Sequence, residues 1–147
     1  MRSDKWLMAG GSLSVVAALL HLAIIVGGPD WYRFFGAGEA MARAAERGSA
    51  RPVIITLGIA AILLVWAAYA FSGAGLIRRL PLLRTALVAI SAVYLARALV
   101  PLPMILARPN LVDPFLMWSS AIVLLYGLAY AIGTWSAWPR LSRREPV

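Results

Sequence analysis

The sequence predicts an all-α polytopic membrane protein: a four-transmembrane-helix bundle with a short amphipathic interfacial helix in the first outer loop. Hydrophobic residues make up 62% of the 147 residues, against about 45–50% in ordinary soluble domains. They gather in four segments, each near the length of about 20 residues that a membrane-spanning helix needs. These segments use most of the chain, so we expect a single membrane domain over residues 1–147.

The four predicted spans cover about residues 6–28, 53–77, 85–106 and 115–138. The first is longer than a signal-peptide core of about 7–15 apolar residues, and no small-residue cleavage pattern follows it, so we expect it to be retained. Pro101 and Pro103 interrupt the third span late. A three-span alternative would make that segment re-entrant and move the C-terminal tail to the opposite side.

Residues 29–52 form a polar outer loop between the first two spans. The loop begins with an aromatic run of a kind typical of headgroup depth, comprising Asp30, Trp31, Tyr32, Arg33, Phe34 and Phe35. Residues 39–47 then favour a helix, because Glu39 and Arg43 are four apart in the stabilising orientation and Gly48 can end it. Its narrow apolar stripe comprises Ala40, Met41, Ala44 and Ala45. We expect this helix to lie on the membrane surface.

Basic residues predict the orientation of the chain, because they are enriched on the cytoplasmic side. One face would carry Arg2, Lys5, Arg78, Arg79, Arg84, Arg140, Arg143 and Arg144. The other would carry Arg33, Arg43, Arg47, Arg51 and Arg108, largely offset by Asp30, Glu39, Glu46 and Asp113. We therefore expect both termini on the cytoplasmic side of an inner membrane. The preference for arginine over lysine suggests a bacterial source.

Arg97 is the most informative single residue, because a guanidinium near the centre of the bilayer costs at least about 2.5–3.5 kcal/mol. None of the four predicted spans contains a carboxylate. A counter-ion must come from an outer loop, with Asp30, Glu39 and Asp113 as candidates, or from a bound anion. Pro101 also removes the amide that would bond the carbonyl of Arg97, which predicts a bend. Alternatively, Arg97 reaches outward to the headgroups and acts as a structural latch.

His21 is the only histidine and lies late in the first span. It could carry a proton, donate to an anion beside Arg97, act as an axial ligand, or simply bond a neighbouring polar group. A metal site normally needs three or four ligands, and the chain has no cysteine. We therefore expect no metal and no cofactor, since haem would need a second histidine from another subunit.

Several polar residues fall at similar depth in the outer halves of their spans, counted at about 1.5 Å per residue. The predicted ligand-binding residues are Arg97, His21, Tyr94, Thr56, Ser119 and Ser120. A lid or counter-ion role is predicted for Asp30, Trp31, Tyr32, Glu39 and Asp113. Tyr94 lies one turn before Arg97 and could instead fill the bundle.

The function predicted first is a non-enzymatic binder or carrier of a lipid-like or amphipathic anion in an outer-half pocket around Arg97 and His21. A structural or accessory subunit of a membrane complex, or a homo-oligomer, is the alternative. Small-residue faces that would suit close helix packing are Gly10, Ser14 and Ala18, Ala68 and Ser72, and Ala129 and Gly133. An intramembrane enzyme using His21 ranks last, because no second catalytic group accompanies it. Membrane lipids are the expected partners, and nucleic acid is not, because the basic residues flank apolar spans.

Overall fold

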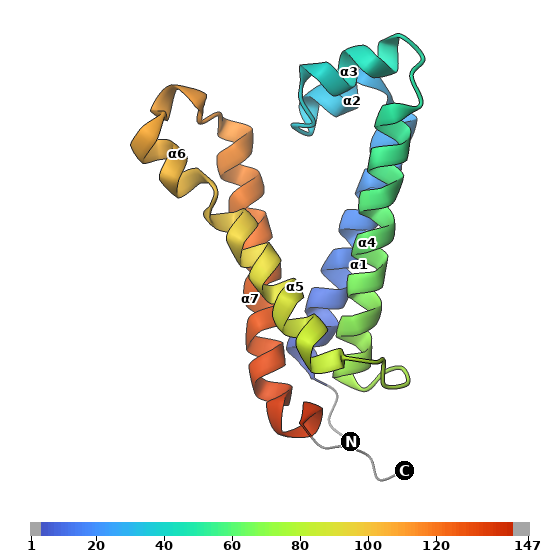
Figure 1. Cartoon of the computed structure of the whole chain (residues 1–147), viewed down its shortest axis with the longest axis vertical. Helices are drawn as coiled ribbons and strands as arrows, with labels where there is room; N and C mark the ends of the chain where they lie inside the picture. The colour runs from blue at the N-terminus through green and yellow to red at the C-terminus, as the bar shows by residue number, and fades with distance from the viewer. Residues whose placement is uncertain (1–3, 143–147) are drawn as a thin grey trace. The chain divides into compact units, whose positions relative to one another are not determined.

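The computed structural model describes residues 4–142, and all regular elements in that range are helices (Figure 1). They are α1 (Lys5–Gly27), α2 (Pro29–Phe34), α3 (Glu39–Glu46), α4 (Arg51–Ala74), α5 (Leu83–Leu99), α6 (Pro101–Ala107), the 3-10 turn η1 (Pro109–Leu111) and α7 (Pro114–Leu141). The all-α prediction is confirmed. Arg2, Arg143 and Arg144, which entered the orientation count, lie outside the described residues.

Four helical segments are long and apolar enough to cross a membrane, which confirms the predicted number of spans. They are Lys5–Gly27, Arg51–Ala74, Leu83–Ala107 and Pro114–Leu141. The second ends three residues earlier than predicted, because Gly75 adopts a φ of 81° that glycine tolerates without steric cost. The amides of Gly75 and Leu76 then bond the carbonyls of Ser72 and Phe71, as in a glycine-terminated helix.

The chain divides into two compact units. Unit 1 comprises Met1–Leu13 and Trp66–Val147, and unit 2 comprises Ser14–Val65. Helices α1 and α4 each contribute residues to both units. Many apolar side chains of the long helices are exposed in both, including Val65 and Leu125, as expected for surfaces that contact lipid chains.

In unit 1 the four long helices pack around one another through closely approaching glycines. Gly11 of α1 lies against the ring of Phe71 in α4, and Gly73 of α4 lies against Leu87 in α5. Gly127 of α7 meets Leu95 of α5 and Gly133 of α7 meets Leu7 of α1, in each case with backbone as well as side-chain contact. Within unit 1 each of the four helices thus contacts two others, in the cyclic order α1, α4, α5 and α7, as in a four-helix bundle. Helices α5 and α7 lie side by side (Figure 1).

Two of the predicted small-residue faces take part in this packing. A Cβ built at Gly10 would lie 2.9 Å from the ring of Tyr130, and Ala129 and Gly133 are buried on α7. Because lipid gives little hydrophobic drive between helices, such close approach allows the van der Waals contact that holds them together. These small residues therefore pack within the chain itself.

In unit 2 the outer loop folds into a helical hairpin, in which α2 and α3 lie side by side (Figure 1). Helix α3 was predicted, but α2 was not: it begins after Gly28, whose φ is 73°, with Pro29 in its first turn, where the missing amide costs nothing. Buried Tyr32 and Ala42 form the core of the hairpin with Ile24 of α1.

The predicted apolar stripe of α3 needs one correction. Met41 and Ala45 pack partly against the hairpin core and Ala44 is buried, but Ala40 is exposed and Ala42 is fully buried in its place. The reason is that α3 packs against protein on the side of Ala42, so its buried face is set by α2 and by the end of α1.

Candidate functional site

The guanidinium of Arg97 lies between α5 and α7 and donates to two serine hydroxyls. Its Nη1 is 3.0 Å from the Oγ of Ser120, and its Nη2 is 3.3 Å from the Oγ of Ser119. The hydroxyl of Ser119 in turn donates to the carbonyl of Leu116 at 3.2 Å. Ser120 is buried, whereas the Arg97 side chain is exposed. The structure therefore brings together three of the predicted ligand-binding residues in unit 1.

Within unit 1, no carboxylate of residues 4–13 or 66–142 forms an ion pair with Arg97. Asp113, one of the predicted counter-ions, instead caps α7 by accepting a hydrogen bond from the amide of Leu116 at 2.6 Å. The partners of Arg97 in this part of the chain are neutral hydroxyls. Among the described residues of unit 1, these hydroxyl dipoles are the groups that solvate its positive charge.

The helix that carries Arg97 breaks one turn later, where the prolines predict a bend. Helix α5 ends at Leu99 and α6 begins at Pro101 (Figure 1). The carbonyl of Arg97 accepts a long 3.4 Å bond from the amide of Val100, because Pro101 has no amide to offer. The break therefore adjoins the Arg97 cluster.

Tyr94 lies in the aromatic core of the bundle, which supports the alternative that it fills space. Its ring centroid is 5.0 Å from that of Trp66, 5.5 Å from Tyr126 and 5.3 Å from Tyr130. Edge-on and tilted aromatic pairs at these separations are favourable. Tyr94 is buried and its ring packs against neighbouring rings from two other helices.

His21 and Thr56 belong to unit 2 and have local partners there. The Nδ1 of His21 is 2.7 Å from the carbonyl oxygen of Ala17, so a neutral ring donates through Nδ1 and leaves Nε2 as an acceptor. Thr56 is buried and donates to the hydroxyl of Tyr32 at 3.4 Å. Tyr32 itself is buried in the hairpin core, a position that the lid prediction did not anticipate.

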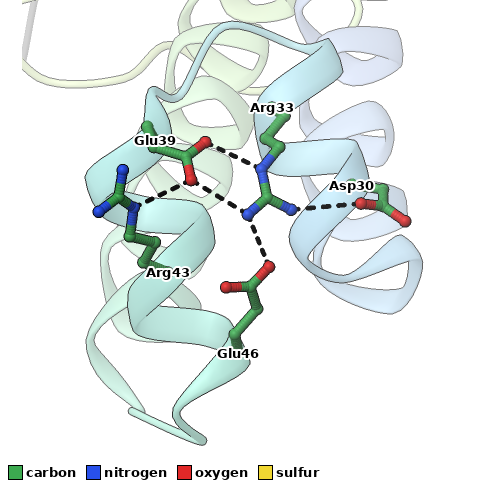
Figure 2. A network of polar contacts seen from close by, with 5 residues as sticks. All are labelled: Asp30, Arg33, Glu39, Arg43 and Glu46. Atoms are coloured by element: carbon green, nitrogen blue, oxygen red, sulfur yellow. Dashed lines mark hydrogen bonds and ion pairs between the residues drawn. The ribbon is translucent and has the colours of Figure 1, made fainter.

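The α2–α3 hairpin is held together by a cluster of charges centred on Arg33 (Figure 2). The guanidinium of Arg33 contacts Glu46 at 2.6 Å, Glu39 at 2.9 Å and Asp30 at 3.3 Å, and Glu39 also accepts from Arg43 at 3.0 Å. The hydrogen bonds from Arg33 and then Arg43 lower the pKa of Glu39 from 4.5 to about 2. Two predicted counter-ions, Asp30 and Glu39, are thus engaged with arginines of their own hairpin.

This cluster predicts an acid-sensitive hairpin. The pKa of Glu39 is lowered from 4.5 to about 2 in the folded protein. Its ionised carboxylate therefore stabilises the hairpin fully at a pH above the unfolded-state pKa, and this stabilisation is lost as the pH falls through the folded-state pKa. We expect the Glu39 carboxyl carbon to titrate near pH 2 by NMR in the wild type, and at clearly higher pH in Arg33→Gln. Arg47→Gln, which removes a nearby charge outside the cluster, should leave it unchanged; equal titration in all three proteins would contradict the network.

The remaining lid candidate, Trp31, lies on the first helix of the hairpin. A Cβ at Gly27 would fall within 2.2 Å of its ring, so glycine is required where the ring crosses the end of α1. Trp31, Phe34 and Phe35 line a hollow of about 540 Å³ together with Asp30. Trp31 and Phe34 remain exposed, which is typical of aromatic side chains at a membrane interface.

Sequence reasoning missed the polar contacts that join the two ends of unit 1. Buried Asp4 caps α1 by accepting from the amides of Trp6 at 3.0 Å and Leu7 at 3.1 Å. Its other oxygen accepts from the hydroxyl of Ser136 and pairs with Arg140 at 3.4 Å. An aspartate directly before an apolar span is an N-cap signal, and it could have identified Asp4.

Among residues 4–142, no three potential metal-ligating side chains lie close enough together to hold an ion. Comparison with known proteins gives no assignment either: no family model, no curated protein and no solved structure matches this chain.

Proposed function

We propose that this protein is a non-enzymatic binder or carrier of an amphipathic anion, whose charged head is held by Arg97 with Ser119 and Ser120. The observation that carries the proposal is an exposed guanidinium in a membrane-spanning segment whose partners in unit 1 are neutral hydroxyls. An arginine in such a segment is costly unless it is paired. A bound carboxylate or phosphate would supply the missing negative charge.

The shape of the arginine suits such a head group. A guanidinium can donate two parallel hydrogen bonds to one carboxylate or phosphate. The hydroxyl of Ser120, which accepts from Arg97, can donate its own hydrogen to the same group. A serine hydroxyl acts as a nucleophile when an adjacent general base activates it. Because the partners of Ser119 and Ser120 within the described part of unit 1 are a guanidinium and a backbone carbonyl, the cluster favours binding over catalysis.

The surface next to Arg97 suits the apolar part of the same ligand. Val93 lies four residues before Arg97 on α5, hence on the same helical face, and half of its surface is exposed. Ala89, a further turn away, is also exposed. An acyl chain lying along α5 would therefore meet apolar side chains while its head group reaches Arg97.

The proposed setting is a bacterial inner membrane, with both termini in the cytoplasm. Four spans place the described ends of the chain on the same side of the membrane. The described basic residues at that end, Lys5, Arg78, Arg79, Arg84 and Arg140, favour the cytoplasmic side by the positive-inside rule. Arg97 would then lie toward the outer half of its span.

Oleate binding to the detergent-solubilised full-length protein tests the proposal, with oleyl alcohol as the uncharged control. We expect oleate, but not oleyl alcohol, to raise the thermal midpoint and to remain bound in native mass spectrometry. Arg97→Leu should reduce oleate retention about tenfold or more, because one charge-assisted hydrogen bond contributes about 1.5–3 kcal/mol. Arg97→Lys should keep part of it.

Arg108→Gln is the matched control, since it removes an exposed arginine of unit 1 outside the cluster. Equal oleate retention by wild type and Arg97→Leu would remove the binding proposal. The bonds from Arg97 across to α7 also suit the alternative of a structural latch. In that case Arg97→Leu would destabilise the ligand-free protein, and oleate would not stabilise the wild type.

A further inference from the structure

A second cationic surface lies at the other end of the bundle, in the loop between α4 and α5. This loop contains Arg78 and Arg79, and Arg84 follows in the first turn of α5. Residues 75–85 include no acidic residue. The one described carboxylate at this end is that of Asp4. It already accepts from two backbone amides and from the hydroxyl of Ser136, and it pairs with Arg140. The loop therefore carries a local excess of positive charge.

The loop is held in a defined conformation by the hydroxyl of Ser72. This hydroxyl donates to the carbonyl of Arg78 at 3.0 Å and accepts from the amide of Leu80 at 3.0 Å. Leu82 closes the loop with a φ of 53°, a left-handed conformation that is unfavourable for a residue other than glycine. The anchored loop presents its charges from a preformed backbone.

Neutral groups of α7 position two of the three arginines. Arg79 donates to the carbonyls of Leu141 and Arg140 at the C-terminal end of α7. The guanidinium carbon of Arg84 lies 4.4 Å from the centroid of the Trp138 ring, and its Nη1 is 3.3 Å from the Oγ of Ser142. These contacts orient the two guanidiniums.

Apolar side chains surround the charges, as expected where a protein surface meets both head groups and acyl chains. Leu82 is 79% exposed, and Leu76 and Ile77 nearby are about half exposed. Trp135 and Trp138 of α7 are exposed at the same end, and tryptophan is enriched at membrane–water interfaces. Residues Arg79 to Thr85 line a hollow of about 560 Å³.

We propose that this loop binds the phosphate of an anionic phospholipid head group, with Arg78, Arg79 and Arg84 facing the phosphate and Leu82 contacting the acyl chains. Basic residues beside a transmembrane helix attract anionic lipid head groups. The loop adds a fixed backbone, a shallow open hollow beside Arg79 and Arg84 and an exposed leucine to that general attraction. This site is separate from the Arg97 cluster and does not depend on it.

Native mass spectrometry of the full-length protein with phosphatidylglycerol and phosphatidylcholine tests the proposal. We expect the wild type to retain phosphatidylglycerol in preference, and Arg78→Gln to lower that retention about fivefold, which corresponds to the loss of about 1 kcal/mol for one basic residue. Arg78→Lys should restore most of it. Arg47→Gln, an exposed arginine of unit 2, is the charge-matched control and should have no effect.

Three results would overturn the proposal: equal retention of the two lipids, equal phosphatidylglycerol retention in wild type and Arg78→Gln, or displacement by millimolar inorganic phosphate, which would indicate a site for the free ion. Arg97→Leu separates this site from the proposed function. It should reduce oleate retention about tenfold or more and leave phosphatidylglycerol retention intact. Should Arg78→Gln fail to fold, Arg84→Gln tests the same surface at its other edge.

Discussion

We expect Gly133→Ala to lower the thermal midpoint of the solubilised protein, even though alanine is the better helix former. A Cβ at this position would lie 2.8 Å from the backbone nitrogen of Leu7 and 2.7 Å from its Cγ. A flexible side chain could move away, but a backbone atom cannot move without shifting α1 from α7. Overpacking of this kind costs about 1–3 kcal/mol, which exceeds the gain in helix propensity of about 1 kcal/mol.

Gly58→Ala is the matched control, because Gly58 is a helical glycine of α4 with nothing within 4 Å of a built Cβ. There the same substitution should raise the midpoint or leave it unchanged, since only the propensity term acts. Tryptophan fluorescence during heating in one detergent would measure both variants against the wild type. If Gly133→Ala stabilised the protein as much as Gly58→Ala, the close contact between α1 and α7 would be wrong.

The spans were predictable from the sequence, because bilayer thickness fixes the length of an apolar segment whatever its neighbours are. Their ends were less so. Leu76 and Ile77 continue the apolar composition beyond the true end of α4 at Ala74, so hydropathy alone extends the helix. The helix ends because Gly75 adopts a positive φ, and not because the sequence becomes polar.

The charge cluster of the outer hairpin could not be read from local spacing. Arg33 and Glu46 are 13 residues apart, and they meet because Gly36 and Gly38, both with positive φ, reverse the chain between α2 and α3. The sequence predicted the contact between Glu39 and Arg43, which lie on one helix, because helical periodicity alone determines it. Contacts across a turn depend on the conformation of that turn.

The candidate site was anticipated in part. Depth along the spans correctly grouped Arg97 with Ser119 and Ser120, because position along a helix follows directly from residue number. The counter-ion role of Asp113 was not supported within unit 1, and the sequence carried the reason: an aspartate followed by proline is typical of a helix N-cap with proline in the first turn. Its carboxylate is engaged by the amide of Leu116.

The second large effect is expected at Asp4, whose carboxylate joins the start of α1 to the end of α7. Asp4→Ala removes a helix cap, worth about 1 kcal/mol, and also the contacts with Ser136 and Arg140. Since Asp4 is only 8% exposed, its carboxylate is shielded from water, although the Arg140 side chain is about half exposed. We expect a total loss of about 2–3 kcal/mol in unfolding free energy.

Asp113→Ala provides the comparison that isolates the contacts between helices. Asp113 caps α7 in the same way but is exposed and makes no ion pair within the described residues, so its loss should cost only the capping contribution of about 1 kcal/mol. Asp4→Asn keeps a capping oxygen and should fall between wild type and Asp4→Ala. Thermal and denaturant unfolding in detergent would rank the variants. Equal losses for Asp4→Ala and Asp113→Ala would mean that Asp4 acts as a cap alone, and that its contacts with α7 contribute nothing to the bundle.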